Sequence, residues 1–220
     1  MLRKEAVSAT LSHVLSRLMA MEVLANHHLV GGTALALQIG HRISVDIDLF
    51  SSQQSDYSVI ENKILAEFSG EAQILHYINS PLGKGISLSI TGIKTDILDW
   101  AKSFQFPIVQ QEGIRLACLE EIAVMKLNII ASPPELVRYE KKDFVDLAFL
   151  LEEFSLQELI EFFHQQNPGF AFPERMVLEA LQTAELADKK PHPRMLIPLD
   201  WPASKQKINE AVQRYVKWEN

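Results

Sequence analysis

The chain has 220 residues, a formal net charge of −7, 47% hydrophobic and 22% charged residues, and a single cysteine, Cys118. This length and composition are typical of a globular protein with one domain, or with one domain and a helical extension. The acidic balance argues against a general nucleic-acid coat, and one cysteine excludes an internal disulfide framework and a cysteine-built zinc site. Neither a bilayer-spanning apolar run nor an amino-terminal signal pattern is present, so we expect a cytoplasmic protein with no membrane partner.

The first predicted element is a helix over about residues 4–26, where apolar side chains recur at helical spacing. We expect this helix to pack against the core and to carry no chemistry. The apolar run His28–Val30 then predicts a short strand, and residues 34–38 predict a second helix.

Gly31, Gly32 and Thr33 separate this strand from the second helix. Glycines remove the side chains that would keep a ligand away from the backbone, and the free amides at a helix start attract a phosphate. The triplet therefore indicates a nucleotide-binding turn. A tight turn without a ligand explains the two glycines equally well at this stage.

Asp46 and Asp48 stand two residues apart between Val45, Ile47 and Leu49. On a strand, this spacing directs both carboxylates to one face and the three apolar side chains to the other. Two acids on one face repel each other unless a cation lies between them, and Mg²⁺ takes carboxylate oxygens while keeping positions open for substrate phosphates. The pattern therefore predicts a site for Mg²⁺, with Mn²⁺ as an alternative. Its simpler interpretation is an exposed strand face.

A third helix is predicted over residues 56–68, after which the pattern changes to that of β-strands. Residues 73–78, 86–91 and 93–98 have strand-like sequences and are separated by turn residues. We interpret these segments as a mainly antiparallel meander added to the strand of Asp46 and Asp48.

Asp96 interrupts the last of these predicted strands. If this strand lies beside the one that carries Asp46 and Asp48, Asp96 brings a third carboxylate to the metal. Asp99 competes for the same role, and a solvent-facing strand residue is the simpler interpretation of Asp96.

After Pro107 the chain is predicted to be helical. The predicted helices are Leu119–Ile130, a helix from about Glu135 or Tyr139 to Phe154, a helix opened by the capping-box pattern Ser155–Glu158, and helices near residues 174–187 and 205–218. We therefore expect an α/β half over residues 1–105 and a helical half over residues 106–220, which form one compact unit with a cleft between them.

Charged residues on two of these helices form a second candidate site. Lys126 stands on an otherwise apolar helix, and Lys142, Asp143 and Asp146 follow on the next one. Taken alone, Lys126 is expected to extend its charged end into solvent, and Lys142 and Asp146 to form an exposed pair at i,i+4 spacing. The order in which they follow the Gly-Gly-Thr and Asp-x-Asp motifs weakens this interpretation.

Four segments together resemble the AbiEii/AbiGii toxin family, a branch of the polymerase-beta-like nucleotidyltransferase superfamily: Gly31–Leu37, Gly40–Phe50, Ile122–Leu127 and Lys141–Leu147. The resemblance covers about residues 27–152. It implies the nucleotidyltransferase fold, of α/β (α+β) class, with a mixed, mainly antiparallel sheet and a carboxy-terminal helical bundle. It also implies a metal-dependent enzyme that transfers a nucleoside monophosphate from a nucleoside triphosphate to a hydroxyl, and that acts as the toxin of a toxin–antitoxin or phage-defence module.

The resemblance assigns roles to individual residues. Asp46 and Asp48 are implied as the catalytic metal-binding pair, and Asp96 would complete a second metal position. Lys126 is implied as the essential lysine of the family and Asp143 as its late acid, with Asp146 as the alternative for that acid. Nucleotide contacts are expected from Gly31, Gly32, Thr33, Arg42, Lys126 and Lys142.

The acceptor and the partners stay open at this stage. RNA is favoured as acceptor, with the 3′ end of tRNA implied by some relatives, and a protein hydroxyl is the alternative. A non-catalytic nucleotide-binding module that regulates a partner is the rival from another class. A cognate antitoxin is expected by resemblance. From Asp188 onward basic residues outnumber acidic ones, which predicts an RNA contact surface, although a solvated surface explains the same charges.

Overall fold

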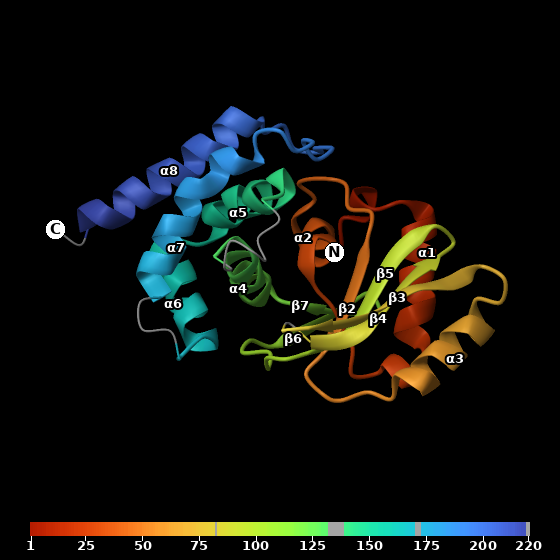
Figure 1. Ribbon diagram of the computed structural model, residues 1–220. Helices are drawn as coiled ribbons and strands as arrows, with labels where there is room; N and C mark the ends of the chain where they lie inside the picture. Colours follow the sequence, from red (N-terminus) through yellow and green to blue (C-terminus); the bar gives the residue numbers. More distant parts are fainter. Residues whose placement is uncertain (82, 132–138, 170–172, 219–220) are drawn as a thin grey trace. The chain divides into compact units, whose positions relative to one another are not determined.

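The structure is a computed structural model and describes residues 1–81, 83–131, 139–169 and 173–218 of the chain (Figure 1). The chain divides into two compact units, Met1–Cys118 and Leu119–Asn220. The first unit contains a seven-stranded sheet, and the elements described in the second unit are helices. This arrangement confirms the predicted α/β class with carboxy-terminal helices.

The sheet of the first unit has the strand order β3-β4-β5-β2-β1-β7-β6. Two neighbouring pairs, β2/β5 and β1/β7, are parallel, and the other pairs are antiparallel. The strands are β1 (His28–Leu29), β2 (Ile47–Ser51), β3 (Ala72–Ser80), β4 (Gly83–Ile90), β5 (Ile93–Trp100), β6 (Ile108–Gln111) and β7 (Ile114–Ala117). The mixed, mainly antiparallel sheet is therefore confirmed.

The predicted meander is present as β3, β4 and β5. Its second turn consists of Thr91 and Gly92, which have φ values of 50° and 81°. A two-residue turn with positive φ at both positions matches the twist of a hairpin and fixes the register of its strands. In that register Ser87 of β4 stands opposite Asp96 of β5.

The two edges of the sheet differ in length and regularity. The edge strand β3 has nine residues and pairs with β4, but its register shifts between Ile74 and His76. Leu75 is therefore an extra residue, as in a β-bulge, and its side chain is exposed. The opposite edge strand, β6, has four residues.

Helices of the first unit pack against this sheet. They are α1 (Ala9–Ala20), α2 (Gly31–Ile39) and α3 (Tyr57–Glu67), with short 3-10 turns η1 (Lys4–Ala6) and η2 (Glu22–Leu24). α1 contacts β5 and β7, α3 contacts β3, and Figure 1 shows α1 and α3 on the same side of the sheet. The sheet contributes Ile47, Leu49 and Ile97 to the buried core.

The first helix is shorter than the prediction of residues 4–26 at both ends. It begins after Ser8, whose Oγ accepts a hydrogen bond from Leu11 N, and beyond Ala20 the chain is bound by Arg115. The Arg115 guanidinium donates hydrogen bonds to the carbonyl oxygens of Met19 (3.0 Å), Leu24 (3.0 Å) and His27 (3.2 Å). These bonds satisfy carbonyl groups of the irregular chain between α1 and β1 and of the last turn of α1. A residue far along the chain thus ends the helix, and local periodicity contains no trace of it.

His27 lies immediately before β1 and is 2% exposed. Within the described part of the chain, neither of its ring nitrogens has a hydrogen-bond partner. Burial is the main cause that lowers the pKa of His27 to about 4. The ring is therefore neutral in the folded protein at neutral pH.

The chain after Pro107 forms a hairpin first, so the expectation that it becomes helical at once is wrong. β6 and β7 pair through a turn at Glu112 and Gly113, whose φ values are 51° and 80°. β7 also pairs with β1, with Leu29 beside Leu116. These contacts place residues 108–117 in the sheet, and the first unit therefore extends to Cys118 rather than ending near residue 105.

The second unit contains five helices among its described residues. They are α4 (Leu119–Ile130), α5 (Lys141–Glu153), α6 (Leu156–Gln166), α7 (Pro173–Leu181) and α8 (Trp201–Trp218), with the 3-10 segment η3 (Gln182–Ala187). The predicted capping box at Ser155 and Glu158 is confirmed. Glu135, one of the two predicted starts of the α5 helix, lies outside the described residues. Among the helices that are described, none combines the length and apolar character needed to cross a membrane.

Candidate functional site

Asp48 and Asp96 are side by side in the sheet of the first unit. They are register partners on the adjacent parallel strands β2 and β5. Register partners on neighbouring strands point to the same face of a sheet, so both carboxylates share one face. The expectation that the strand of Asp96 lies beside the strand of Asp48 is confirmed.

Asp46 precedes β2, which begins at Ile47. Ile47 and Leu49 are buried as predicted, but the prediction that Val45 is directed to the same apolar face is wrong, since 62% of Val45 is exposed. Strand alternation does not extend to residue 45 because the chain there lies outside the strand. The Thr33 hydroxyl contacts the backbone carbonyl oxygen of Asp46 and so fixes this segment against α2.

Both oxygens of the Asp96 carboxylate have partners. Ser87 Oγ on β4 donates a hydrogen bond to Asp96 Oδ1 at 2.6 Å, and Lys94 Nζ forms an ion pair with Oδ2. The side chain of Asp96 is 20% exposed and that of Lys94 is 46% exposed. This acid is thus held on one side by a buried hydroxyl and on the other by a cation that reaches solvent.

Asp99, the competing third acid, has a different position. It pairs in register with Ser51, three residues along each strand from the Asp48–Asp96 pair, and therefore points to the opposite face. Its carboxylate accepts hydrogen bonds from Ser55 N (2.8 Å) and Ser55 Oγ (2.6 Å). Asp99 anchors the loop before α3, and the structure does not bring it to the face of Asp48 and Asp96.

The glycines at the start of α2 allow two charged side chains to approach the backbone. A Cβ atom at Gly31, where φ is +66°, would lie 3.0 Å from Asp48 Oδ2. A Cβ atom at Gly32 would lie 2.4 Å from Arg42 Nη2. Gly31 and Gly32 therefore leave room for a carboxylate and a guanidinium group close to the backbone at this helix end, and the positive φ of Gly31 also favours glycine.

The start of α2 keeps backbone amides available for an anion. Its N-cap residue, Val30, makes no side-chain capping bond. An uncapped helix start presents unpaired N–H groups and the positive end of the helix dipole. Thr33 is buried in the first turn, and its hydroxyl lies 2.8 Å from Ser44 Oγ. In this structure Thr33 holds residues 44–46, and the phosphate contact predicted for it stays a prediction.

The carboxylates fit a metal that also takes oxygens from its substrate. Within the described residues, no three His, Cys, Asp or Glu side chains gather closely enough to hold a metal ion by themselves. Mg²⁺ commonly takes one or two carboxylates and completes its shell with water and substrate phosphates. Asp48 and Asp96, adjacent on one face, supply such a pair of oxygen donors. Participation of Asp46 as the third ligand stays a prediction.

In the second unit, Lys126 forms a buried charged cluster with two acids. Its Nζ lies 2.6 Å from Asp143 Oδ1 and 2.7 Å from Asp146 Oδ2. The side chains of Lys126, Asp143 and Asp146 are 4%, 4% and 0% exposed. The expectation that Lys126 extends into solvent is therefore wrong. The expectation of an exposed Lys142–Asp146 pair is also wrong, because Asp146, like Lys126, faces the packed interior between α4 and α5.

One oxygen of the Asp143 carboxylate can accept a further hydrogen bond. Its Oδ2 is buried and has no hydrogen-bond partner among the residues that the structure describes. A buried carboxylate oxygen without a partner costs free energy unless a water or ligand satisfies it. Both acids that compete for the role of late acid contact Lys126, and Lys142 is partly exposed beside them.

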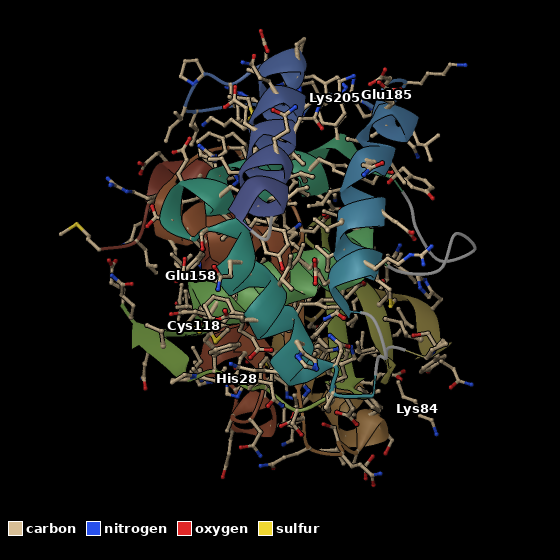
Figure 2. All side chains as sticks on the ribbon, turned by 90° about the vertical axis from the view of Figure 1, so that its left-hand side faces the viewer. His28, Lys84, Cys118, Glu158, Glu185 and Lys205 are labelled. Carbon is tan, nitrogen blue, oxygen red and sulfur yellow. The ribbon has the colours of Figure 1, made fainter. Side chains whose placement is uncertain are left out.

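Three lysines of the basic carboxy-terminal segment, Lys190, Lys205 and Lys207, pair with acids of their own unit. Lys205, labelled in Figure 2, lies 2.9 Å from Asp188 Oδ1, and Trp201 Nε1 donates to the same oxygen at 2.6 Å. The hydrogen bond from Trp201, followed by that from Lys205, lowers the pKa of the Asp188 carboxyl. Lys190 and Lys207 pair with Glu140 and Glu152. These pairs favour a solvated surface, and an RNA contact surface here stays a prediction.

Sequence reasoning assigned no role to Ser87, Lys94 or Ser44, although Ser44 lies in the matched segment Gly40–Phe50. The first two could have been found from the hairpin. A two-residue turn at Thr91 and Gly92 places Ser87 opposite Asp96, and strand alternation places Lys94 on the same face as Asp96. Ser44 offers no such signal, because only the tertiary fold brings it to Thr33.

Comparison with known proteins adds independent information. A family model described as "Nucleotidyl transferase AbiEii toxin, Type IV TA system" matches residues 13–218. An uncharacterized protein of Aquifex aeolicus (strain VF5) is 27% identical over 153 residues, which are 66% of this chain and 68% of that protein.

Two solved structures have a similar fold. One is from H. pylori and is described as that of a candidate nucleotidyltransferase; it has a TM-score of 0.55 and 18% identity and covers 94% of this chain and 92% of that chain. JHP933 from Helicobacter pylori has a TM-score of 0.54 and 18% identity, and the alignment covers 94% of this chain and 89% of that one. At this identity the likeness concerns the fold alone.

Proposed function

The chain belongs to the AbiEii family of nucleotidyltransferase toxins, and from this premise we propose that it transfers a nucleoside monophosphate to RNA in a metal-dependent reaction. The proposed acceptor is the hydroxyl at the 3′ end of a tRNA. The observation that carries the proposal is the placement of Asp48 and Asp96 in register on one face, with Asp48 against the uncapped start of α2.

In the proposed reaction the acceptor hydroxyl attacks the α-phosphorus of a nucleoside triphosphate. A phosphorus–oxygen bond to the acceptor forms, the bond between the α-phosphorus and the bridging oxygen breaks, and pyrophosphate leaves with that oxygen. The hydroxyl proton passes to Asp96 or to water. A bound Mg²⁺ or Mn²⁺ would neutralise charge on the phosphates and on the attacking and leaving oxygens.

The residues of the first unit would position the triphosphate. Asp48 and Asp96, with Asp46 as a further donor, would hold the metal. The amides of Gly31 and Gly32 would bind phosphate oxygens at the start of α2. Arg42, whose guanidinium lies against Gly32, would add positive charge at this helix end.

Residues of the second unit enter the proposal through Lys126. The family resemblance assigns it the role of essential lysine, and in this structure its ammonium group is held by Asp143 and Asp146. We propose that these two acids fix its position and that Lys126 and Lys142 neutralise phosphate charge. Membership in a toxin family described with a type IV TA system indicates a cognate antitoxin. A role in phage defence is part of the proposal.

The test is incorporation of labelled nucleotide. Each of the four labelled nucleoside triphosphates is incubated with the protein and Mg²⁺, in separate reactions with total RNA and with total protein. The Asp46→Asn, Asp48→Asn double variant is the control, and omission of the divalent cation tests metal dependence. We expect label in RNA that requires both the metal and the two aspartates.

The other outcomes separate the alternatives. If the wild type labels protein and the double variant does not, the acceptor is a Tyr, Ser or Thr hydroxyl of a protein. Nucleotide binding without transfer to either acceptor would favour a regulatory module. Transfer at the wild-type rate by the double variant would exclude the assigned metal site.

A further inference from the structure

Asp96 already has a cationic partner at one of its two carboxylate oxygens. Lys94 stands two residues earlier on β5, so both side chains project from the same face of the strand. Its ammonium group pairs with Asp96 Oδ2, while Ser87 Oγ donates to Oδ1 at 2.6 Å. Each oxygen of this carboxylate therefore has a partner within the protein.

The two partners of Asp96 differ in how easily they can leave. Ser87 is fully buried on β4, and the hairpin register fixes it opposite Asp96. Lys94 is about half exposed and carries its charge at the end of a flexible four-carbon chain. An ion that approaches Asp96 would therefore displace Lys94, while Ser87 would keep the carboxylate oriented.

The ion pair also offsets part of the repulsion between two acids that stand in register. Neighbouring strands lie about 4.8 Å apart, so the carboxylates of Asp48 and Asp96 repel each other when both are ionised. The ammonium of Lys94 offsets the charge of Asp96. A divalent ion held by both carboxylates would compete with Lys94 for Asp96.

We propose that Lys94 is a positioning residue that acts as the resident counter-ion of Asp96 and must be displaced when the catalytic metal binds. The proposal rests on the proposed function, because it assumes that Asp48 and Asp96 bind the metal. Lys94 then sets the metal concentration at which the site fills. It keeps the acidic face ordered and closed to weakly bound cations until a divalent ion and a triphosphate arrive together.

The test is the affinity for Mn²⁺ of the full chain, measured from the electron paramagnetic resonance signal of free Mn²⁺ with a non-hydrolysable nucleoside triphosphate present. Replacing Lys94 by the uncharged Lys94→Met removes a competing charge, and we expect Mn²⁺ to bind about fivefold more tightly, as for loss of one exposed ion pair. Lys94→Gln provides a second neutral side chain. Lys94→Arg retains the cation and should stay within about twofold of the wild type.

Lys84, labelled in Figure 2, offers a matched control on the neighbouring strand. It is exposed and stands opposite Asp99, on the face away from Asp96. Lys84→Met removes the same charge from the same sheet, and we expect unchanged Mn²⁺ affinity. If Lys84→Met and Lys94→Met raise the affinity for Mn²⁺ equally, the effect is due to the net charge of the protein and the proposal is overturned.

The remaining outcomes distinguish this proposal from the proposed function. If wild-type Mn²⁺ binding is lost in Asp48→Asn but unchanged or weakened in Lys94→Met and Lys94→Gln, the metal site stands and the role of Lys94 is refuted. If the wild type shows no Mn²⁺ binding that depends on Asp48, the metal site itself is refuted, and the role of Lys94 with it.

Discussion

The two charged clusters of this molecule differ in their access to solvent. Asp96 and Lys94 of the first unit are 20% and 46% exposed, whereas Lys126, Asp143 and Asp146 of the second unit are 0–4% exposed. The first cluster can exchange one partner for a ligand, because Lys94 can turn into water. The second cannot open without leaving buried charges uncompensated. Asp96 and Lys126, which both receive roles from the same family resemblance, thus lie in different physical environments.

The energetics follow from this difference. An exposed ion pair contributes about 0–1 kcal/mol to stability, so the first cluster can be altered with little effect on folding. Removal of one partner from a buried ion pair costs about 3–5 kcal/mol, because the remaining charge stays desolvated. Variants in the first cluster should therefore change chemistry with little loss of stability, whereas variants in the second should lower stability in addition to removing the phosphate contact proposed for Lys126.

The largest effect is expected from Asp48→Asn. Loss of one metal-binding carboxylate should lower the rate of nucleotide transfer by about 10³-fold, since charge stabilisation of the phosphates is lost. The variant should stay folded, because asparagine has nearly the same size and shape as aspartate. Transfer rates and thermal unfolding are measured on the same sample. If Asp48→Asn fails to fold, Asp48 has a structural role and this prediction is wrong.

Lys126→Met tests the buried cluster of Lys126, Asp143 and Asp146. Two buried acids would lose their common cation, and we expect the free energy of unfolding to fall by about 3–5 kcal/mol in urea titrations. Lys190→Met is the matched control, because Lys190 forms an exposed pair with Glu140 in the same unit, and its loss should cost less than about 1 kcal/mol. Equal small losses in both variants would contradict the distinction between the clusters.

The pH dependence of stability provides a test in the first unit that involves the buried ring of His27 and neither Asp96 nor Lys94. The pKa of His27 is about 4 in the folded chain against 6.5 when unperturbed, so the unfolded chain binds more protons between these values. Stability should therefore fall as the pH drops from about 6.5 to about 4, by about 2–3 kcal/mol between pH 7.5 and 4.5.

The matched variant for this titration is His27→Phe. It keeps a ring of similar shape and removes the titrating group, so its unfolding free energy should lack this part of the pH dependence. Urea titrations of both proteins at the two pH values measure the difference. Parallel pH profiles would show that the buried ring is not the cause.

The smallest effect is expected from Gly32→Ala. The added Cβ would meet Arg42 Nη2 and displace the guanidinium from the start of α2. We expect KM for the nucleoside triphosphate to rise about tenfold, equivalent to about 1.4 kcal/mol, while alanine's helix propensity limits any loss of stability to less than about 1 kcal/mol. Steady-state kinetics with thermal unfolding measure both. An unchanged KM would show that the position of Arg42 does not affect nucleotide binding.

Periodic patterns predicted the parts of the fold that depend on neighbouring residues. The alternation over residues 86–91 and 93–98 identified β4 and β5, and the Ser155 pattern identified the start of α6. The end of α1 was missed because it depends on Arg115, and the strand β7 was missed because it is stabilised by pairing with β1. Such contacts between distant parts of the chain leave no local pattern.

The same limit applies to the candidate site. Asp48 and Asp96 could be proposed as neighbours because both stand on predicted strands, and the structure confirms their register. The burial of Lys126 could not be predicted, since an isolated lysine on an apolar helix commonly reaches solvent. Its pairing with Asp146 depends on the packing of α4 against α5, which amphipathic patterns do not specify.

The bulge in β3 has a consequence for the behaviour of the protein at high concentration. A long, regular edge strand offers unpaired backbone groups to a second molecule and promotes aggregation. The register shift between Ile74 and His76 interrupts this edge, and the opposite edge, β6, has only four residues. Deletion of Leu75 would straighten β3 and leave an exposed template, so a chain that still folds would be expected to precipitate during expression.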